Sequence, residues 1–125
     1  MLGLKGEVIM FRAIIFFIAT TTSGFALSAT GVLVSKVEQV FVDSVNYGEC
    51  MALVNPGPES ISGPVCAPYF VTFSCSGDFN SKSAGSNKFQ SAQLGLITGK
   101  NVRILFDDTK KHNGYCFAQR IDNYD

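Results

Sequence analysis

Two cysteines bracket an apolar run of aromatic and β-branched residues, CAPYFVTFSC, over residues 66–75. Residues 69–75 alternate as a strand does, with Tyr69, Val71 and Phe73 on one face. At about 3.3 Å per residue, an extended segment over 66–75 spans roughly 30 Å, whereas a disulfide needs Cα atoms about 4.4–6.8 Å apart. The two cysteines therefore cannot bond to each other, and each must reach a different element of the fold.

The chain has four cysteines, and they predict two disulfides rather than a metal site. Zinc sites usually contain close cysteine pairs or Cys/His clusters. Here the closest two cysteines are nine residues apart, and the single histidine, His112, is isolated. An even number of cysteines in an exported chain is typical of a disulfide framework. Two pairings remain open: Cys50–Cys75 with Cys66–Cys116, or Cys50–Cys66 with Cys75–Cys116.

The N-terminal residues 1–28 have the order of charge and hydropathy of a secretory signal peptide. Met10 and a following arginine precede an uncharged apolar run, residues 13–19 (AIIFFIA), and threonines and small residues come next. This run of seven residues is much shorter than the roughly 20 residues that a membrane-spanning helix needs, so no membrane span is expected after cleavage of the signal. Cleavage is expected after Ser28 or Ala26, and Met10 is a second candidate for the true start.

The remaining chain, residues 29–125, has the size of a single domain, and its charge argues against nucleic-acid binding. Removal of residues 1–28 takes away Lys5, Glu7 and Arg12, so 8 of the 10 basic and 9 of the 10 acidic residues remain. Proteins that bind nucleic acids usually carry a basic patch or stripe. We therefore expect no nucleic-acid partner.

Apolar alternation and turn residues predict five strands and one helix. The strands are expected over residues 31–45, 49–54, 69–75, 102–106 and 115–121. The first strand loses its alternation in the middle, which predicts a bulge or sharp bend near residues 36–39. The helix is expected over 87–98, with Asn87 as its N-cap and Gly99 after its last turn. All four prolines fall within 55–68, which is therefore expected to be a loop.

The predicted order β-β-β-α-β-β, with a long bent first strand, is that of the OB-fold, a five-stranded, partly open Greek-key β-barrel. An open α+β sheet with one helix on it is the alternative. In the barrel the second and third strands run antiparallel, which brings Cys50 close to Cys75. The third and fifth strands lie side by side and run parallel, so Cys66 and Cys116 are neighbours. The barrel therefore favours the pairs Cys50–Cys75 and Cys66–Cys116.

Few residues could carry catalysis, and no enzyme activity, metal or cofactor is expected. His112 is the only histidine, and in a polar turn beside lysines it is expected to be solvated. The sequence has no glycine loop with the spacing that binds phosphate. It also has no Ser/His/Asp order that fits a hydrolase.

The candidate ligand-binding residues are three tyrosines and one asparagine: Tyr47, Tyr69, Asn113 and Tyr115. Exposed tyrosines can stack on a sugar or a partner surface while the hydroxyl group forms hydrogen bonds. OB barrels often bind oligosaccharides or oligonucleotides on the face of strands two and three. A purely structural interpretation is also open, in which Tyr69 and Tyr115 are half-buried strand residues.

The segment GKNVRILFDD over residues 99–108, taken with the strand order and the paired cysteines, resembles the B subunits of AB5 toxins, in particular the subtilase-cytotoxin and pertussis-like B subunits. It is also similar to small secreted bacterial proteins with the same features. The resemblance spans about Val32 to Ile121. It implies a secreted module that forms pentameric rings and binds cell-surface glycans or a protein partner. The alternative is a periplasmic or envelope protein with a structural or inhibitory role.

Overall fold

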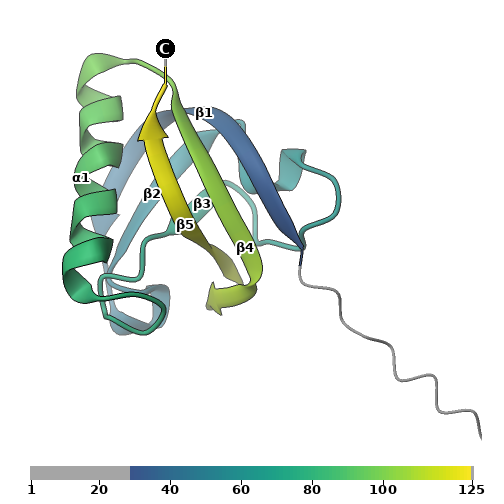
Figure 1. Cartoon of the computed structure of the whole chain (residues 1–125), viewed down its shortest axis with the longest axis vertical. Coiled ribbons are helices and arrows are strands. Elements are labelled where there is room, and N and C mark those ends of the chain that lie inside the picture. The colour runs from purple at the N-terminus through teal and green to yellow at the C-terminus, as the bar shows by residue number, and fades with distance from the viewer. Residues whose placement is uncertain (1–28, 125) are drawn as a thin grey trace, which may run out of the picture.

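A five-stranded mixed sheet closes into a ring in the computed structural model, which describes residues 29–124 (Figure 1). Within these residues the strands are β1 (Thr30–Val42), β2 (Cys50–Asn55), β3 (Phe70–Thr72), β4 (Val102–His112) and β5 (Tyr115–Asn123). The other elements are the helix α1 (Lys82–Thr98) and two 3-10 turns, η1 (Val45–Tyr47) and η2 (Pro58–Ser60). The expected signal peptide, residues 1–28, lies outside the described residues.

The ring runs in the order β1-β2-β3-β5-β4, and β4 pairs with β1 to close it. All neighbouring strands are antiparallel except β3 and β5, which run parallel. The expected order of three strands, a helix and two strands is confirmed. The open-sheet alternative is wrong, because every strand within residues 29–124 pairs with two neighbours and their sheet has no free edge strand.

The first strand serves two neighbours because it bends in the middle. Residues 30–35 pair with β4, and residues 36–42 pair with β2. The register with β2 shifts between Val37 and Gln39, as the interrupted alternation predicted. Core-facing positions are odd-numbered up to Val37, whereas after the bulge the even-numbered Val40 packs against the core. The bulge therefore exchanges the two faces of the strand.

Both disulfides join the cysteines that the barrel order favoured. Cys50 bonds to Cys75 with Cα atoms 5.6 Å apart, and Cys66 bonds to Cys116 with Cα atoms 5.4 Å apart. The alternative pairing is wrong. Since Cys50 begins β2 and Cys116 lies in β5, the two bonds tie the segment around β3 to the strand on each side of it.

The helix α1 begins earlier than expected, and Asn87 is not its N-cap. Ser81 caps the helix, and its hydroxyl oxygen accepts a hydrogen bond from the backbone N–H of Ala84 at 3.0 Å. The first turn is largely polar and exposed, so no apolar periodicity marks its start. A Cβ on Gly85 would lie 2.9 Å from carbonyl oxygens just after β3, so this turn packs closely on the barrel. Gly99 ends the helix at φ 68°, as expected.

Strand β3 is shorter, and β4 and β5 are longer, than expected. Positive φ angles at Tyr69 (75°) and Ser74 (53°) turn the backbone at both ends of β3. Strand β4 continues through a polar stretch as far as His112. The carboxylate of Asp107 is buried there, and the backbone N–H and the hydroxyl group of Thr109 both donate hydrogen bonds to it. Polar residues that marked a turn in the sequence are thus satisfied inside a strand.

One core fills the ring and extends to the helix. Its members come from every strand and from α1, and they include Leu33, Val54, Val71, Phe73, Ala92, Ile104, Phe106 and Ala118. The helix packs against β1, β5 and β2 along one side of the ring (Figure 1). No helix within residues 29–124 is long and apolar enough to cross a membrane.

Candidate functional site

The outer side of β2 and β3 carries a pocket of about 190 Å³, which we call the aromatic pocket. Its lining residues are Phe41, Asp43, Tyr47, Met51, Phe70 and Tyr115. Four of the six are aromatic, one is a carboxylate and none is basic. The pocket therefore offers ring surfaces together with a single acidic group.

Phe70 is the central ring of the aromatic pocket. Its ring centroid lies 5.5 Å from that of Phe41 and 5.7 Å from that of Tyr115, and both pairs meet edge to face. The ring of Tyr115 lies 5.8 Å from that of Tyr47 in a tilted arrangement. Aromatic pairs attract each other at such separations, so the rings hold one another in place.

Strand register brings these rings together from separate segments of the chain. Phe41 in β1 is opposite Met51 in β2. Phe70 in β3 is opposite Leu53, two residues further along β2, so it lies on the same face as Met51. Tyr115 begins β5, directly after the β4–β5 turn. The bulge in β1 is essential to this site, because it places Phe41 on the outer face.

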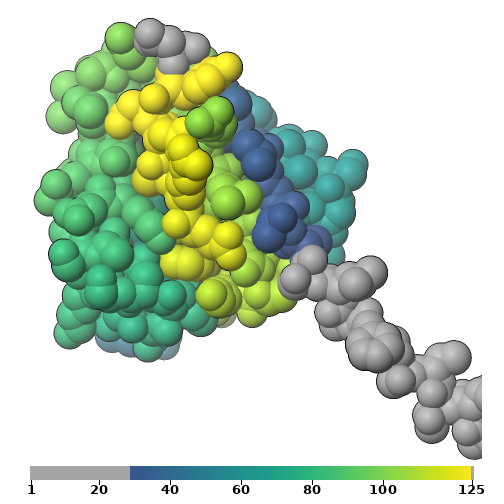
Figure 2. Space-filling model, viewed as in Figure 1, coloured from purple at the N-terminus to yellow at the C-terminus, as the bar shows by residue number. Residues whose placement is uncertain are grey.

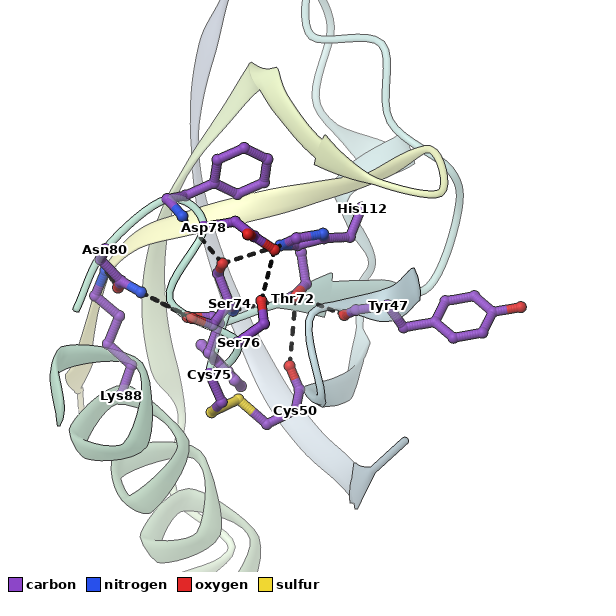
Figure 3. The surroundings of a disulfide bond; sticks show 12 residues. Tyr47, Cys50, Thr72, Ser74, Cys75, Ser76, Asp78, Asn80, Lys88 and His112 are labelled. Carbon is purple, nitrogen blue, oxygen red and sulfur yellow. Dashed lines mark hydrogen bonds and ion pairs between the residues drawn. A yellow bond between two sulfur atoms is a disulfide. The ribbon is translucent and has the colours of Figure 1, made fainter. Parts of the chain in front are cut away.

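Tyr47 reaches the aromatic pocket from the connection between β1 and β2. Its carbonyl oxygen accepts a hydrogen bond of 2.8 Å from Oγ1 of Thr72, as Figure 3 shows. Gly48 follows at φ 77°, and a Cβ there would lie 2.5 Å from Oγ1 of Thr72 and 2.6 Å from Cδ2 of His112. Glycine alone suits this left-handed and crowded position, so the connection lies tightly against the barrel.

The aromatic pocket suits a ligand that has both an apolar face and hydroxyl groups. Tyr47 and Tyr115 are partly buried, and each combines an apolar ring with a polar hydroxyl. Asp43 is exposed, and its Oδ1 accepts a hydrogen bond of 2.7 Å from the backbone N–H of Ser44, which orients the carboxylate. An ionised carboxylate only accepts hydrogen bonds. The pocket therefore favours an uncharged ligand that donates a hydrogen bond to the carboxylate of Asp43, and it disfavours an anion.

The structure brings two of the four predicted candidates together and places the other two elsewhere. Tyr47 and Tyr115 both line the aromatic pocket. Tyr69 is 57% exposed and lines a separate cavity beside Glu59, so the half-buried interpretation is right for Tyr115 and wrong for Tyr69. Asn113 is exposed in the β4–β5 turn at φ 51° and does not line the aromatic pocket.

Sequence reasoning missed four residues of the site, namely Phe41, Asp43, Met51 and Phe70. The alternation over residues 69–75 already separated Phe70 from Val71 and Phe73, so its outward position was within reach. The position of Phe41 depends on where the bulge falls in β1. The sequence locates such a bulge only to within a few residues, and one residue decides the face.

A second group of polar side chains surrounds His112, which is buried (Figure 3). Its Nε2 lies 2.9 Å from Oγ of Ser74 and 3.8 Å from Oδ2 of Asp78, and its ring centroid lies 4.5 Å from that of Phe79. The expectation of a solvated histidine in a turn is wrong, because β4 continues to this residue. The ring lies directly beneath Gly48 of the β1–β2 connection.

This group has the residue types of a hydrolytic triad but a different geometry. In a triad the serine and the carboxylate bind opposite nitrogens of the imidazole, whereas Ser74 and Asp78 both face Nε2 of His112. Ser74 is fully buried, and its Oγ accepts the backbone N–H of Phe79 at 3.2 Å. The serine hydroxyl thus has a structural role. In the part of the chain that the structure describes, no three His, Cys, Asp or Glu side chains are grouped to hold a metal ion.

Comparisons with protein-family models, curated protein sequences and solved structures find no match for this chain. The resemblance to toxin B subunits therefore stays a prediction from the sequence.

Proposed function

We propose that this chain is an exported, non-catalytic binding module with an OB-fold, and that its aromatic pocket binds a neutral sugar residue of a glycan. The observation that carries this proposal is the pocket itself, in which four rings and one carboxylate enclose about 190 Å³ on the outer face of β2 and β3. Pockets for drug-sized ligands have volumes of about 300–1,000 Å³. This smaller pocket fits a single ring better than a large ligand.

The place of the pocket in the ring supports the proposal. The strand order β1-β2-β3-β5-β4, with one parallel pair, is the order expected of an OB barrel. OB barrels bind oligosaccharides and oligonucleotides on the face of strands two and three and on the loops between strands one and two and strands four and five. Tyr47 lies in the first of these loops, and Tyr115 directly follows the second.

Charge favours a sugar over a nucleic acid at this pocket. Asp43 is the only charged residue among the six that line it. Nucleic-acid affinity depends largely on contacts between basic side chains and phosphate groups. A neutral glycan instead presents hydroxyl donors to the carboxylate and C–H surfaces to the rings.

Export belongs to the same proposal. Disulfides form and persist in oxidising compartments, and this chain has two. We place the protein in the periplasm or outside the cell, after cleavage of residues 1–28 or 1–26. N-terminal sequencing of the exported protein should find Ala29 or Leu27 first, and an exported chain that keeps its first residues would contradict this part of the proposal.

A ring of identical copies is the oligomeric state that the resemblance to toxin B subunits supports. Light scattering of the oxidised protein measures its native mass directly. A mass of five chains would support a toxin-like ring. A monomer would remove the ring from the proposal and leave a single-pocket module.

A protein partner is the second candidate function. Val42 and Val45 are 73% and 61% exposed, and they lie on each side of Asp43 in the chain, close to the aromatic pocket. Exposed apolar side chains that cluster near aromatic residues are typical of protein-binding surfaces. An inhibitory or structural role in the envelope requires three results. The wild-type protein should retain one stoichiometric protein partner, the V42S variant should no longer bind that partner, and the wild-type protein should bind no glycan.

A glycan array tests the sugar hypothesis with a control that the chain itself supplies. Y115A removes a ring from the aromatic pocket, whereas Y69A removes an exposed tyrosine from a different cavity. We expect the wild-type protein to bind neutral glycans, Y115A to bind them about tenfold more weakly, and Y69A to bind them unchanged. Failure to bind any glycan, or equal losses in the two variants, would reject the hypothesis.

A further inference from the structure

A groove of about 290 Å³ lies on the outer side of β1, β4 and β5, away from the aromatic pocket. Its lining residues are Val32, Arg103, Leu105, Arg120 and Asp122. Figure 2 views this side of the ring, where β5 and β4 run beside the first part of β1. No residue of the groove belongs to the aromatic pocket, so the two features are independent.

Strand register sets the five side chains of the groove side by side. Across β4 and β5, Arg103 is opposite Asp122 and Leu105 is opposite Arg120. Across β1 and β4, Val32 is opposite Leu105. The two aliphatic side chains therefore form an apolar floor, and the charged side chains stand along one side of it.

Two guanidinium groups share one carboxylate in this groove. Nε and Nη2 of Arg103 donate to Oδ2 of Asp122 at 2.8 and 2.5 Å, and Nε of Arg120 donates to Oδ1 at 2.8 Å. Burial alone would raise the pKa of Asp122, but the hydrogen bonds and charge of Arg103, and then those of Arg120, hold this pKa below its ordinary value. The carboxylate is therefore ionised at neutral pH, and the three groups together carry one positive charge.

The shared carboxylate orients the two arginine side chains but does not use all of their N–H donors. A guanidinium has five N–H donors. Within residues 29–124, Arg120 donates to a side chain only through Nε, so the fork formed by its two terminal nitrogens remains available, and its side chain is 67% exposed. Arg103 also contacts an aromatic ring, because its Cζ lies 5.4 Å from the ring centroid of Tyr124.

We propose that this groove is a second ligand site, which binds the oxyanion of a small ligand on the Arg120 fork and the adjoining apolar part of the ligand on Val32 and Leu105. A guanidinium fork matches carboxylate and phosphate oxygens in a bidentate manner. Val32 is 55% exposed, so an apolar group laid on it would be removed from water. The shared chemistry is an oxyanion beside an apolar stem, and either a carboxylate or a phosphate monoester supplies it.

Titration of the disulfide-bonded protein, followed by NMR of the Val32 and Leu105 methyl groups, tests this proposal. Benzoate and phenyl phosphate are the probes, and inorganic phosphate and benzyl alcohol each lack one half of the required chemistry. We expect saturable shifts with at least one of the two probes, and at least tenfold weaker binding of inorganic phosphate and of benzyl alcohol. Tighter binding of benzoate identifies a carboxylate ligand, and tighter binding of phenyl phosphate identifies a phosphate ligand.

Three variants complete the test. R120Q should weaken binding of the better probe about tenfold, because the charge-assisted hydrogen bonds between the guanidinium group and the oxyanion of the probe are lost. K82Q, which removes one positive charge from the exposed start of α1, should leave binding unchanged. V32T should weaken binding of the better probe but leave binding of inorganic phosphate unchanged. The proposal is overturned if neither probe gives saturable shifts, if benzyl alcohol binds as well as the better probe, or if R120Q binds that probe as tightly as K82Q does.

Discussion

Oγ of Ser74 and Nε2 of His112 lie 2.9 Å apart, are both buried, and connect the segment after β3 to the end of β4. Ser74 also precedes Cys75 of the first disulfide, so the hydrogen bond and the covalent bond act on the same short segment (Figure 3). His112 in turn lies beneath Gly48, which follows Tyr47 of the aromatic pocket. The buried Ser74–His112 pair therefore supports the β1–β2 connection that carries Tyr47 of the aromatic pocket.

Replacement of the histidine should cost stability. H112A leaves the buried hydroxyl group of Ser74 without its side-chain partner, and we expect the free energy of unfolding to fall by about 1–3 kcal/mol. Guanidinium denaturation followed by circular dichroism measures the change. S86A, at an exposed position of α1, is the control and should change the stability by less than about 0.5 kcal/mol. A similar result for both variants would mean that the Ser74–His112 pair contributes nothing.

At Gly48, the contribution of close packing to stability can be measured separately from that of the left-handed backbone angle. Gly48 and Gly99 both have left-handed φ angles, 77° and 68°, but only at Gly48 would a Cβ meet other atoms. G99A should cost about 1 kcal/mol of stability from the backbone alone. G48A should cost roughly 1–3 kcal/mol more, because the methyl group overlaps Thr72 and His112. Equal losses in thermal or chemical denaturation would contradict the tight packing of the β1–β2 connection.

The two disulfides should differ in their contribution to stability. Cys50–Cys75 closes a loop over a sequence separation of 25, and Cys66–Cys116 over a separation of 50. The chain-entropy estimate is about 3.5 kcal/mol for the first bond and about 4 kcal/mol for the second. Replacement of each pair by alanines, followed by guanidinium denaturation, measures both values. Losses below about 1 kcal/mol for both pairs would contradict a stapling role.

Acid should destabilise the protein partly through Asp107. The hydroxyl group of Thr109 donates a hydrogen bond to this carboxylate and, with its backbone N–H, Lys110 and Gln119, holds the pKa of Asp107 below its ordinary value of 3.8 despite burial. The unfolded chain therefore binds this proton more tightly than the folded chain. The stabilisation is present above the unfolded pKa and is lost as the pH falls through the folded pKa.

Denaturation curves between pH 7 and pH 2 test this linkage. The free energy of unfolding of the wild-type protein should begin to fall near pH 5 and continue to fall towards lower pH. D107N should be less stable than the wild type at pH 7 and should show a shallower decline in acid. An identical slope in the two proteins would contradict the assigned role of the Asp107 carboxylate.

Much of the topology could be predicted because local patterns encode it. The lost alternation near residues 36–39 marks the bulge of β1, and the barrel order then decides between the two disulfide pairings. Element ends were harder to predict. Ser81 starts a helix whose first turn has no apolar stripe. Strand β4 continues through polar residues to His112, and the long-range partners of this stretch, Gln119 for Asp107 and Ser74 for His112, are not visible in the sequence.

The candidate site could be predicted only in part, for a related reason. Tyr47 and Tyr115 stand beside turns, where an exposed tyrosine is conspicuous in the sequence. Phe41 and Phe70 look like ordinary core residues until the register shows them on the outer face. A one-residue slip in register exchanges the two faces of a strand, so the composition of the pocket depends on a bulge position that the pattern does not resolve.

The four tyrosines of the chain provide the most direct test of the account. Tyr47 and Tyr115 line the aromatic pocket, whereas Tyr69 lines another cavity and Tyr124 lies beside Arg103. Protein with ¹³C-labelled tyrosine rings can be titrated with glucose, galactose, mannose and N-acetylglucosamine, and with glucuronate as the anionic comparison. We predict saturable shifts of the Tyr47 and Tyr115 rings with at least one neutral sugar and weaker binding of glucuronate. Shifts confined to Tyr69 or Tyr124, or no saturable shift with any sugar, would contradict a glycan site in the aromatic pocket.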